Sequence, residues 1–280
     1  MTMRGLDIKP ERPNGVLVFA GPPNVGKSTM ARAIAEHLFD ALDRVLTIEM
    51  AQFQEEHTIH QLIGSPPGYV GYDEGGRLDW VNDVRCGVIV LDNLHIAHPN
   101  IIALFEQIFD TGVITNMRHE RLFFSDVIFV ITCDIRTQRS GRVGFQAVGQ
   151  EDISVERQVR ELLGDALLDR VDAVCPFYPL SLETVERIIA TKLLPALLSR
   201  AQEEGIFIEV APDVASFLAR QVYSPEQGMH RADAAVQRIF MNPVLEAADA
   251  ARSSECSAGA RVSVTVCGDC LVAVLMEEGD

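Results

Sequence analysis

The sequence predicts an α/β fold, in which a parallel β-sheet flanked by helices is followed by a small, mostly helical domain that ends in a β-hairpin. Over residues 1–177, strand-like apolar runs alternate with helix-like segments, which is the pattern of a parallel sheet with helices on its faces. From Ser181 onward, helix-like segments dominate until two strand-like runs close the chain. We therefore expect a large domain over residues 1–177 and a small C-terminal domain over residues 178–280.

Composition limits the class of protein and its partners. At about 150 residues per domain, a chain of 280 residues corresponds to roughly two domains. With 48% hydrophobic and 23% charged residues it is of the globular class, not disordered, collagen-like or coiled-coil. The 24 Lys and Arg against 40 Asp and Glu leave a net charge of −16, so we expect no nucleic acid partner. The apolar runs are too short to span a bilayer, and residues 1–15 lack the apolar core of a signal peptide, so we expect no membrane insertion and a cytoplasmic location.

Short apolar runs predict the strands of the parallel sheet. They are rich in Val, Ile and Leu, as expected of strands that are buried on both faces. The runs occupy residues 16–20, 45–48, 87–91 and 127–132. Between them, residues 29–38 and 101–109 carry apolar side chains at helical spacing, so we expect helices there.

Helix signals define the small domain. Ser181 is a suitable N-cap for a helix that Pro195 should kink and that Gly205 should end. Asp213 opens another helix, and a third helix-like segment runs from about residue 230 to residue 250. These segments predict a helical domain that the closing strands complete.

Cys267 and Cys270 form a Cys-x-x-Cys motif near the end of the chain. Gly268-Asp269 between them is a tight-turn signal, and strand-like runs flank the motif on both sides, which favours a β-hairpin. Half of a zinc site or a redox pair is the alternative, but no second pair of Cys or His lies nearby in the sequence. Six cysteines in the whole chain are too few for a disulfide framework.

A phosphate-binding loop follows the first predicted strand. Residues 21–28 match the pattern G-x-x-x-x-G-K-[S/T] and lead into a predicted helix, which is the context that this motif requires. The glycines let backbone N–H groups turn toward a phosphate, Lys27 can reach the β- and γ-phosphate oxygens, and Ser28 can bind Mg²⁺. The predicted nucleotide-binding residues of the loop are Gly21, Pro22, Pro23, Asn24, Val25, Gly26, Lys27, Ser28 and Thr29.

A carboxylate at the end of a second strand completes the predicted magnesium site. The apolar run at residues 87–91 leads directly to Asp92, and ligand sites of open α/β sheets lie at the carboxyl ends of the strands. Hydroxyl and carboxylate oxygens suit Mg²⁺, so Ser28 and Asp92 are the predicted metal ligands. A strand-end Asp without a ligand is the alternative interpretation.

Three further stretches resemble the Clp unfoldase chaperones of the AAA+ superfamily, in particular the second ATPase module of ClpB-type proteins. They lie at residues 62–76, 92–99 and 223–228, and the likeness extends over almost the whole chain. The resemblance implies an AAA+ P-loop NTPase fold that uses ATP and Mg²⁺. It also implies a ring-forming oligomer whose partner is a protein client or a Clp-type ATPase.

The resemblance also assigns a loop that grips the substrate polypeptide in the central pore of the ring. By that likeness the pore-loop residues are Gly68, Tyr69, Val70 and Gly71. An aromatic residue on a loop rich in Gly and Pro can stack on any polypeptide. A surface turn on which Tyr69 packs down is the alternative.

Arg170 stands at the position of the family's arginine finger. Such an arginine would point into the nucleotide of a neighbouring subunit and stabilise charge on the transferring phosphoryl group. A surface salt bridge with Asp165 or Asp169 is the alternative.

The chain departs from the resembled family at residues close to the chemistry. Asn93 replaces a Glu that polarises the attacking water, and an amide cannot accept the proton, although it can orient a water. Asp134 replaces an Asn that positions this water, and it would bring negative charge near the γ-phosphate unless it is protonated or turned away. In the small domain, Met229, His230 and Arg231 stand where the family has Ala-Arg, which displaces the arginine by one residue. We keep His230 and Arg231 as candidate nucleotide-binding residues.

Together these observations predict a Clp-like ATP-binding module that acts in protein remodelling or assembly, with weak or lost hydrolysis. Two alternatives remain open. One is a working ATP-dependent unfoldase or disaggregase whose altered residues are compensated locally. The other is a non-catalytic scaffold or interaction protein that uses nucleotide only for stability.

Overall fold

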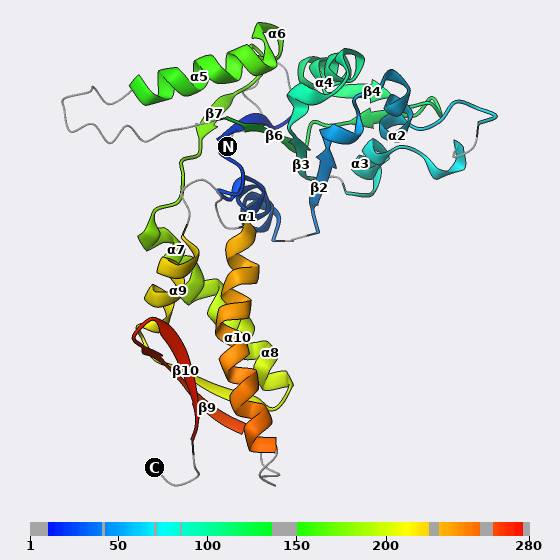
Figure 1. The fold of residues 1–280 in the computed structure, drawn as a ribbon. Helices are drawn as coiled ribbons and strands as arrows, with labels where there is room; N and C mark the ends of the chain where they lie inside the picture. The colour runs from blue at the N-terminus through cyan, green and yellow to red at the C-terminus, as the bar shows by residue number, and fades with distance from the viewer. Residues whose placement is uncertain are drawn as a thin grey trace. The chain divides into compact units, whose positions relative to one another are not determined.

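The computed structural model describes residues 11–40, 43–69, 72–84, 86–135, 150–223, 230–252 and 260–276 (Figure 1). The chain divides into two compact units, Met1–Tyr178 and Pro179–Asp280. Within the ranges given above, no helix combines the length and the apolar character that crossing a membrane requires.

A five-stranded parallel sheet forms the centre of the first unit. Its strand order is β2-β3-β6-β1-β7. The strands are β1 (Gly15–Gly21), β2 (Val45–Glu49), β3 (Gly87–Asp92), β6 (Val127–Asp134) and β7 (Ala173–Pro176). The strands expected at residues 16–20, 45–48, 87–91 and 127–132 are confirmed. The apolar pattern misses β7, because this strand is only four residues long and ends in proline.

Helices and short elements surround this sheet (Figure 1). The helices of the first unit are α1 (Lys27–Phe39), α2 (His60–Ile63), α3 (Trp80–Asp83), α4 (Pro99–Thr111), α5 (Gln150–Leu163) and α6 (Asp165–Leu168). The helices expected at residues 29–38 and 101–109 are confirmed as α1 and α4. A short antiparallel pair, β4 (Val113–Thr115) and β5 (Arg121–Phe123), follows α4.

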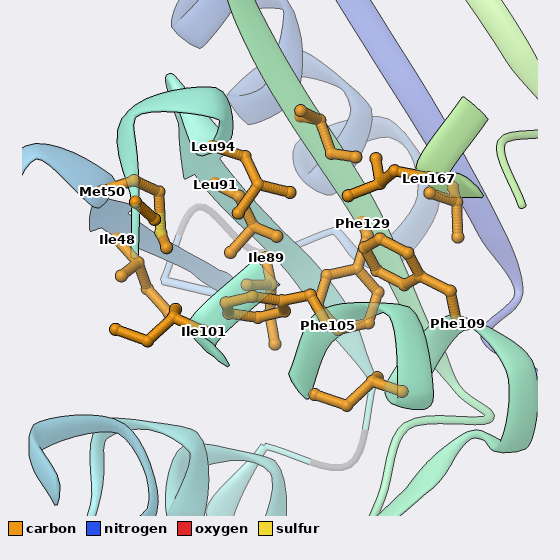
Figure 2. Packing of buried hydrophobic residues seen from close by; sticks show 14 of the residues in the cluster. Ile48, Met50, Ile89, Leu91, Leu94, Ile101, Phe105, Phe109, Phe129 and Leu167 are labelled. Atoms are coloured by element: carbon orange, nitrogen blue, oxygen red, sulfur yellow. The ribbon is translucent and has the colours of Figure 1, made fainter. Parts of the chain in front are cut away.

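The two faces of the sheet bury different sets of side chains. Val88 and Val90 of β3 pack with Ala31 and Ala35 of α1. The alternate residues of β3 and β6 face the opposite way, into the larger cluster drawn in Figure 2. That cluster includes Ile89, Leu91, Phe105, Phe109, Phe129 and Ile131. Strands buried on both faces explain why these runs are apolar throughout, with no alternation.

The second unit combines helices with a small sheet. Its helices are α7 (Leu182–Ile188), a π-helical turn (Ile189–Leu193), α8 (Leu194–Glu203), α9 (Val214–Val222) and α10 (His230–Arg252). The predicted N-cap is confirmed, because the Ser181 hydroxyl accepts a hydrogen bond from the Thr184 backbone N–H. The π-helical turn directly precedes α8, which carries Pro195 in its first turn.

The hairpin expected at the end of the chain is present, but it belongs to a larger sheet. Strands β9 (Ala260–Cys267) and β10 (Cys270–Leu275) pair antiparallel, with Cys270 opposite Cys267. A strand absent from the sequence prediction, β8 (Ile206–Val210), pairs with β9 in parallel, which gives the order β10-β9-β8. Both cysteines are exposed, and the described part of the chain holds no group of three His, Cys, Asp or Glu side chains suited to a metal ion.

Candidate nucleotide-binding site

The carboxyl ends of the three central strands bring the predicted site residues together. In the register of β1 and β6, Gly21 lies opposite Asp134. In the register of β3 and β6, Asp92 lies opposite Thr132. The loop after β1, the strand-end carboxylate of β3 and the polar end of β6 therefore meet at one edge of the sheet, where ligands of open α/β sheets bind.

The loop between β1 and α1 has the backbone of a phosphate cradle. Asn24 and Gly26 adopt left-handed conformations, with φ of 62° and 100°, and α1 begins at Lys27. A Cβ added to Gly26 would meet no heavy atom within 4 Å, so the space beside the loop is open. At Gly21, by contrast, an added Cβ would lie 2.3 Å from the Phe177 carbonyl oxygen, which requires glycine there. The loop therefore combines open space beside Gly26 with the N-terminus of a 13-residue helix, and both features favour a bound anion.

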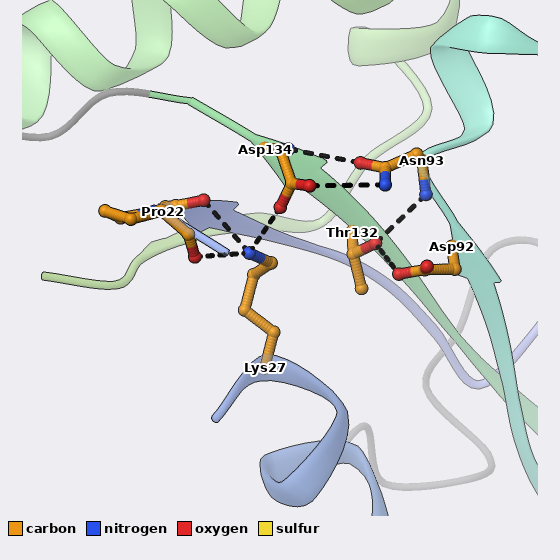
Figure 3. Close-up of polar contacts among 7 residues, drawn as sticks. Pro22, Lys27, Asp92, Asn93, Thr132 and Asp134 are labelled. Carbon is orange, nitrogen blue, oxygen red and sulfur yellow. Dashed lines mark hydrogen bonds and ion pairs between the residues drawn. The ribbon is translucent and has the colours of Figure 1, made fainter. Parts of the chain in front are cut away.

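Lys27 occupies the centre of this edge. Its side chain is only 7% exposed, and its ammonium donates to the carbonyl oxygens of Gly21 at 3.0 Å and Pro22 at 2.7 Å (Figure 3). It also forms an ion pair with Asp134, with 2.8 Å between Nζ and Oδ1. A buried ammonium requires such partners, because burying an unpaired charge is costly. Asp134 is therefore not turned away from the site but neutralises the phosphate-loop lysine.

A buried hydroxyl connects the ends of β3 and β6. Thr132 is fully buried, and its Oγ1 donates a hydrogen bond to Oδ1 of Asp92. The same hydroxyl accepts a hydrogen bond of 3.0 Å from the Asn93 backbone N–H. The sequence analysis places Thr132 in a strand but not among the site residues. A hydroxyl residue inside an apolar strand is itself a signal, because buried hydroxyls are hydrogen-bonded.

Asn93 and Asp134 bond directly to each other. The Asp134 backbone N–H donates to Oδ1 of Asn93 at 3.2 Å, and Nδ2 of Asn93 donates to Oδ2 of Asp134 at 3.4 Å (Figure 3). Asn93 has a left-handed backbone, with φ of 57°, which this residue type tolerates better than most. Two of the residues that depart from the resembled family therefore form one hydrogen-bonded pair.

The residues predicted to bind Mg²⁺ fit that ion. Ser28 is exposed beside Lys27 in the first turn of α1, and Asp92 is half-buried at the end of β3. Mg²⁺ in nucleotide sites keeps several waters and takes only one or two protein oxygen ligands besides the phosphates. A hydroxyl and a carboxylate at this edge of the sheet match that requirement.

Two further titratable groups flank the site. Burial raises the pKa of the Cys133 thiol to about 12, against a smaller lowering by Lys27. Cys133 is therefore a protonated thiol at neutral pH and is no nucleophile. Burial lowers the pKa of His95, with Asp134 opposing the shift, and Nδ1 of His95 is shielded from solvent.

Tyr69 extends into solvent from the loop after α2. Its side chain is 72% exposed, so it does not pack down onto the surface. Gly68 before it has φ of 86°, a backbone conformation that favours glycine. Of the other predicted pore-loop residues, Val70 and Gly71 lie outside the described residues.

Arg170 forms an ion pair within its own unit. Its Nε donates to Oδ2 of Asp110 on α4 at 2.8 Å, and its guanidinium also contacts the Ala166 carbonyl oxygen. A salt bridge is present, as the alternative expected, but its acidic partner is Asp110. Asp165 pairs with Arg160 instead. The sequence gives no signal for Asp110, since its position opposite Arg170 depends on how α4 packs.

The candidate residues of the small domain are only partly described. His230 and Arg231 lie in the first turn of α10. Their side chains lie outside the described residues, as do residues 224–229 with most of the motif that precedes them. Their part in nucleotide binding stays a prediction.

Comparison with known proteins identifies the family of the first unit. Residues 12–174 match the family model described as AAA domain (Cdc48 subfamily). The chain is 32% identical over 239 residues to the chaperone protein ClpB of Lactococcus lactis, which covers 84% of this chain and 28% of that protein. It is 32% identical over 247 residues to ClpC, an ATP-binding subunit of the ATP-dependent Clp protease of Staphylococcus saprophyticus, over 85% of this chain and 30% of that protein. A 34% identity to ClpB of Enterococcus faecalis covers 78% of this chain and 26% of that protein.

These matches bear out the resemblance in the part of the chain that holds the site. The chain spans less than a third of the length of these relatives, so the similarity does not assign the activities of the whole relatives to this chain. The family match covers the parallel sheet, the phosphate loop and the strand ends that form the site. The chain therefore belongs to the AAA domain family, and its α/β fold is that of a P-loop NTPase.

Proposed function

We propose that this chain is a Clp-like module that binds ATP with Mg²⁺, hydrolyses it slowly, and acts in protein remodelling or assembly in the cytoplasm. The observation that carries the proposal is the buried Lys27 ammonium at the head of the loop between β1 and α1. A buried cation beside an open glycine-rich loop and a helix N-terminus is suited to polyphosphate. The similarity to ClpB and ClpC supports the choice of ATP.

Each residue of the site has a part in this proposal. Backbone N–H groups of the loop, from Gly21 to Thr29, surround the phosphates, and Lys27 turns its ammonium to their oxygens. Ser28 and Asp92 hold Mg²⁺, which neutralises charge on the β- and γ-phosphates. Thr132 fixes the Asp92 carboxylate through its hydroxyl. His230 and Arg231 of the small domain are proposed to contact the nucleotide.

Slow hydrolysis follows from two features of the site. The amide of Asn93 cannot accept a proton from water. Asp134 pairs with Lys27, so ATP must draw the ammonium away from this carboxylate before the phosphates are held. Hydrolysis therefore lacks a proton acceptor at position 93 and requires that the Lys27–Asp134 ion pair first separate.

Steady-state turnover tests this proposal. We expect Mg²⁺-dependent binding of ATP, together with a turnover well below the rate of about 10 per second that is typical of enzymes. The measurements are a binding titration with a slowly hydrolysed fluorescent ATP analogue and a phosphate-release assay on the full chain. Turnover near 10 per second would favour an active unfoldase instead, and an absence of binding would contradict the whole proposal.

We also propose that the chain works in a ring, either its own or one shared with a Clp-type ATPase. In that ring Tyr69, with Gly68, Val70 and Gly71, contacts the protein client. Arg170 leaves Asp110 and reaches the nucleotide of the adjoining subunit. Support comes from the exposure of Tyr69 and from the position of Arg170 near the end of α6.

Nucleotide should therefore promote assembly through Arg170. In sedimentation velocity with the ATP analogue and Mg²⁺, we expect a larger species for the natural chain and a smaller shift for Arg170→Ala. Arg157→Ala is the matched control, because Arg157 is an exposed arginine of α5 that pairs with Glu161 one turn along the same helix. A monomer under all conditions, alone and with a Clp ATPase added, would rule out the ring.

A further inference from the structure

The carboxylate of Asp134 bridges two functional groups of the site. Oδ1 accepts from the Lys27 ammonium at 2.8 Å, and Oδ2 accepts from the Asn93 amide at 3.4 Å. The Asn93 amide oxygen in turn accepts from the Asp134 backbone N–H at 3.2 Å. This reciprocal pair fixes the direction of the carboxylate between the end of β3 and the phosphate loop (Figure 3).

Among the described groups around Lys27, Asp134 is the one suited to accept a proton from water. Asn93 is an amide and has no basic atom. Asp92 receives the Thr132 hydroxyl and is the proposed metal ligand, so its negative charge is already engaged. Nδ1 of His95 is shielded from solvent. The Asp134 side chain is 43% exposed, so water reaches this carboxylate while the buried ammonium holds its other side.

We propose that Asp134 is the general base for ATP hydrolysis in this chain, and that Asn93 is a positioning residue that orients its carboxylate. The inference rests on the proposed function, because it requires that ATP binds at Lys27. Where the resembled family has a carboxylate after β3 and an amide at the end of β6, this chain has the amide of Asn93 and the carboxylate of Asp134. Because Asn93 and Asp134 are hydrogen-bonded to each other, the site still holds one carboxylate and one amide side by side.

The step balances without a further reactant. The water oxygen forms a bond to the γ-phosphorus, and the bond from that phosphorus to the oxygen bridging to the β-phosphate breaks, with its electron pair staying on ADP. The proton of the water passes to the carboxylate of Asp134 and leaves with phosphate or solvent. Before this step, Lys27 turns from Asp134 to the phosphates, which frees the carboxylate as ATP binds.

The test separates turnover from affinity in the full chain. For Asp134→Asn we expect turnover to fall by about 10²–10⁴-fold. The same variant should bind the slowly hydrolysed ATP analogue at least as tightly as the natural chain, because the neutral amide no longer repels the γ-phosphate. Asp134→Glu should regain part of the turnover, since it restores a carboxylate.

The reverse exchange provides a second, independent arm. The double variant Asn93→Glu with Asp134→Asn puts the carboxylate on β3 and the amide on β6, and it should recover at least the turnover of the natural chain. Asn93→Ala should lower turnover less than Asp134→Asn and leave affinity for the analogue nearly unchanged. His95→Gln is the matched control for the other proton acceptor nearby and should retain turnover.

Turnover of Asp134→Asn equal to or above that of the natural chain would overturn the proposal and leave Asp134 as an ion-pair partner of Lys27 only. Turnover of the natural chain no higher than that of Lys27→Ala would also overturn it. In either case, binding of the analogue by the natural chain would show that the proposed nucleotide site stands. If the natural chain does not bind the analogue, that separate result contradicts the proposed function itself.

Discussion

Replacing Lys27 with alanine is expected to weaken binding of ATP by about 10²–10⁴-fold. Hydrogen bonds to charged groups contribute about 1.5–3 kcal/mol each, and Lys27 would make about two of them to the phosphates, at 1.4 kcal/mol for each factor of ten. The substitution also leaves the Asp134 carboxylate without its counter-charge, next to the phosphates. Titration with the fluorescent ATP analogue in the presence of Mg²⁺ measures the loss.

Lys192→Ala is the matched control for this substitution. Lys192 is an exposed lysine of the π-helical turn in the second unit, so its removal changes the net charge equally without touching the loop. Circular dichroism should show that both variants keep the fold. Equal affinity of Lys27→Ala and the natural chain would mean that the loop between β1 and α1 does not bind the phosphates.

Replacing Phe129 with alanine is expected to destabilise the first unit by about 3–5 kcal/mol. Phe129 is fully buried in β6, and its ring centroid lies 5.1 Å from that of Phe109, 5.8 Å from that of Phe124 and 6.4 Å from that of Phe105. The lost side chain would leave a cavity among three other rings, which rigid strands and α4 cannot close. This loss is a large part of the total stability of about 5–15 kcal/mol that is typical of folded proteins.

Urea unfolding followed by tryptophan fluorescence measures this effect in the first unit alone. The chain has one tryptophan, Trp80 in α3, which packs against the same cluster as Phe129. Phe123→Ala is the control, because Phe123 is 59% exposed on β5, where the Arg121 guanidinium lies over its ring. A loss of stability no larger for Phe129→Ala than for Phe123→Ala would contradict the central place of Phe129 in the core.

The sequence predicted the local elements of the site because their signals are local. The apolar run before Gly21, the glycine-rich loop and the helix after it lie within one continuous stretch. Asp92 follows its own strand in the same way. Strand β7 escaped prediction because it has only four residues, one exposed and three half-buried, which carry too weak a pattern. Strand β8 escaped because its five residues, Ile-Phe-Ile-Glu-Val, do not alternate clearly between apolar and polar.

Contacts between distant segments could not be predicted from single motifs. Asn93 and Asp134 are 41 positions apart, and only the register of β3 against β6 brings them together. Considered one at a time, they represent the loss of a base and of a water-positioning amide. As a bonded pair they retain one carboxylate and one amide. The ion pair of Arg170 with Asp110 depends in the same way on the packing of α4.

The strand order of the sheet has a consequence for how this protein folds during synthesis. Strand β1 precedes its two partners in the chain, yet it ends up between them, beside residues 127–134 on one side and residues 173–176 on the other. Until the ribosome has released those segments, β1 exposes two unpaired edges, which are templates for pairing with other chains. Such long-range pairing also slows folding, because the loop-closure entropy must be overcome first. The nascent phosphate loop therefore remains without its supporting strands until β6 and β7 have emerged.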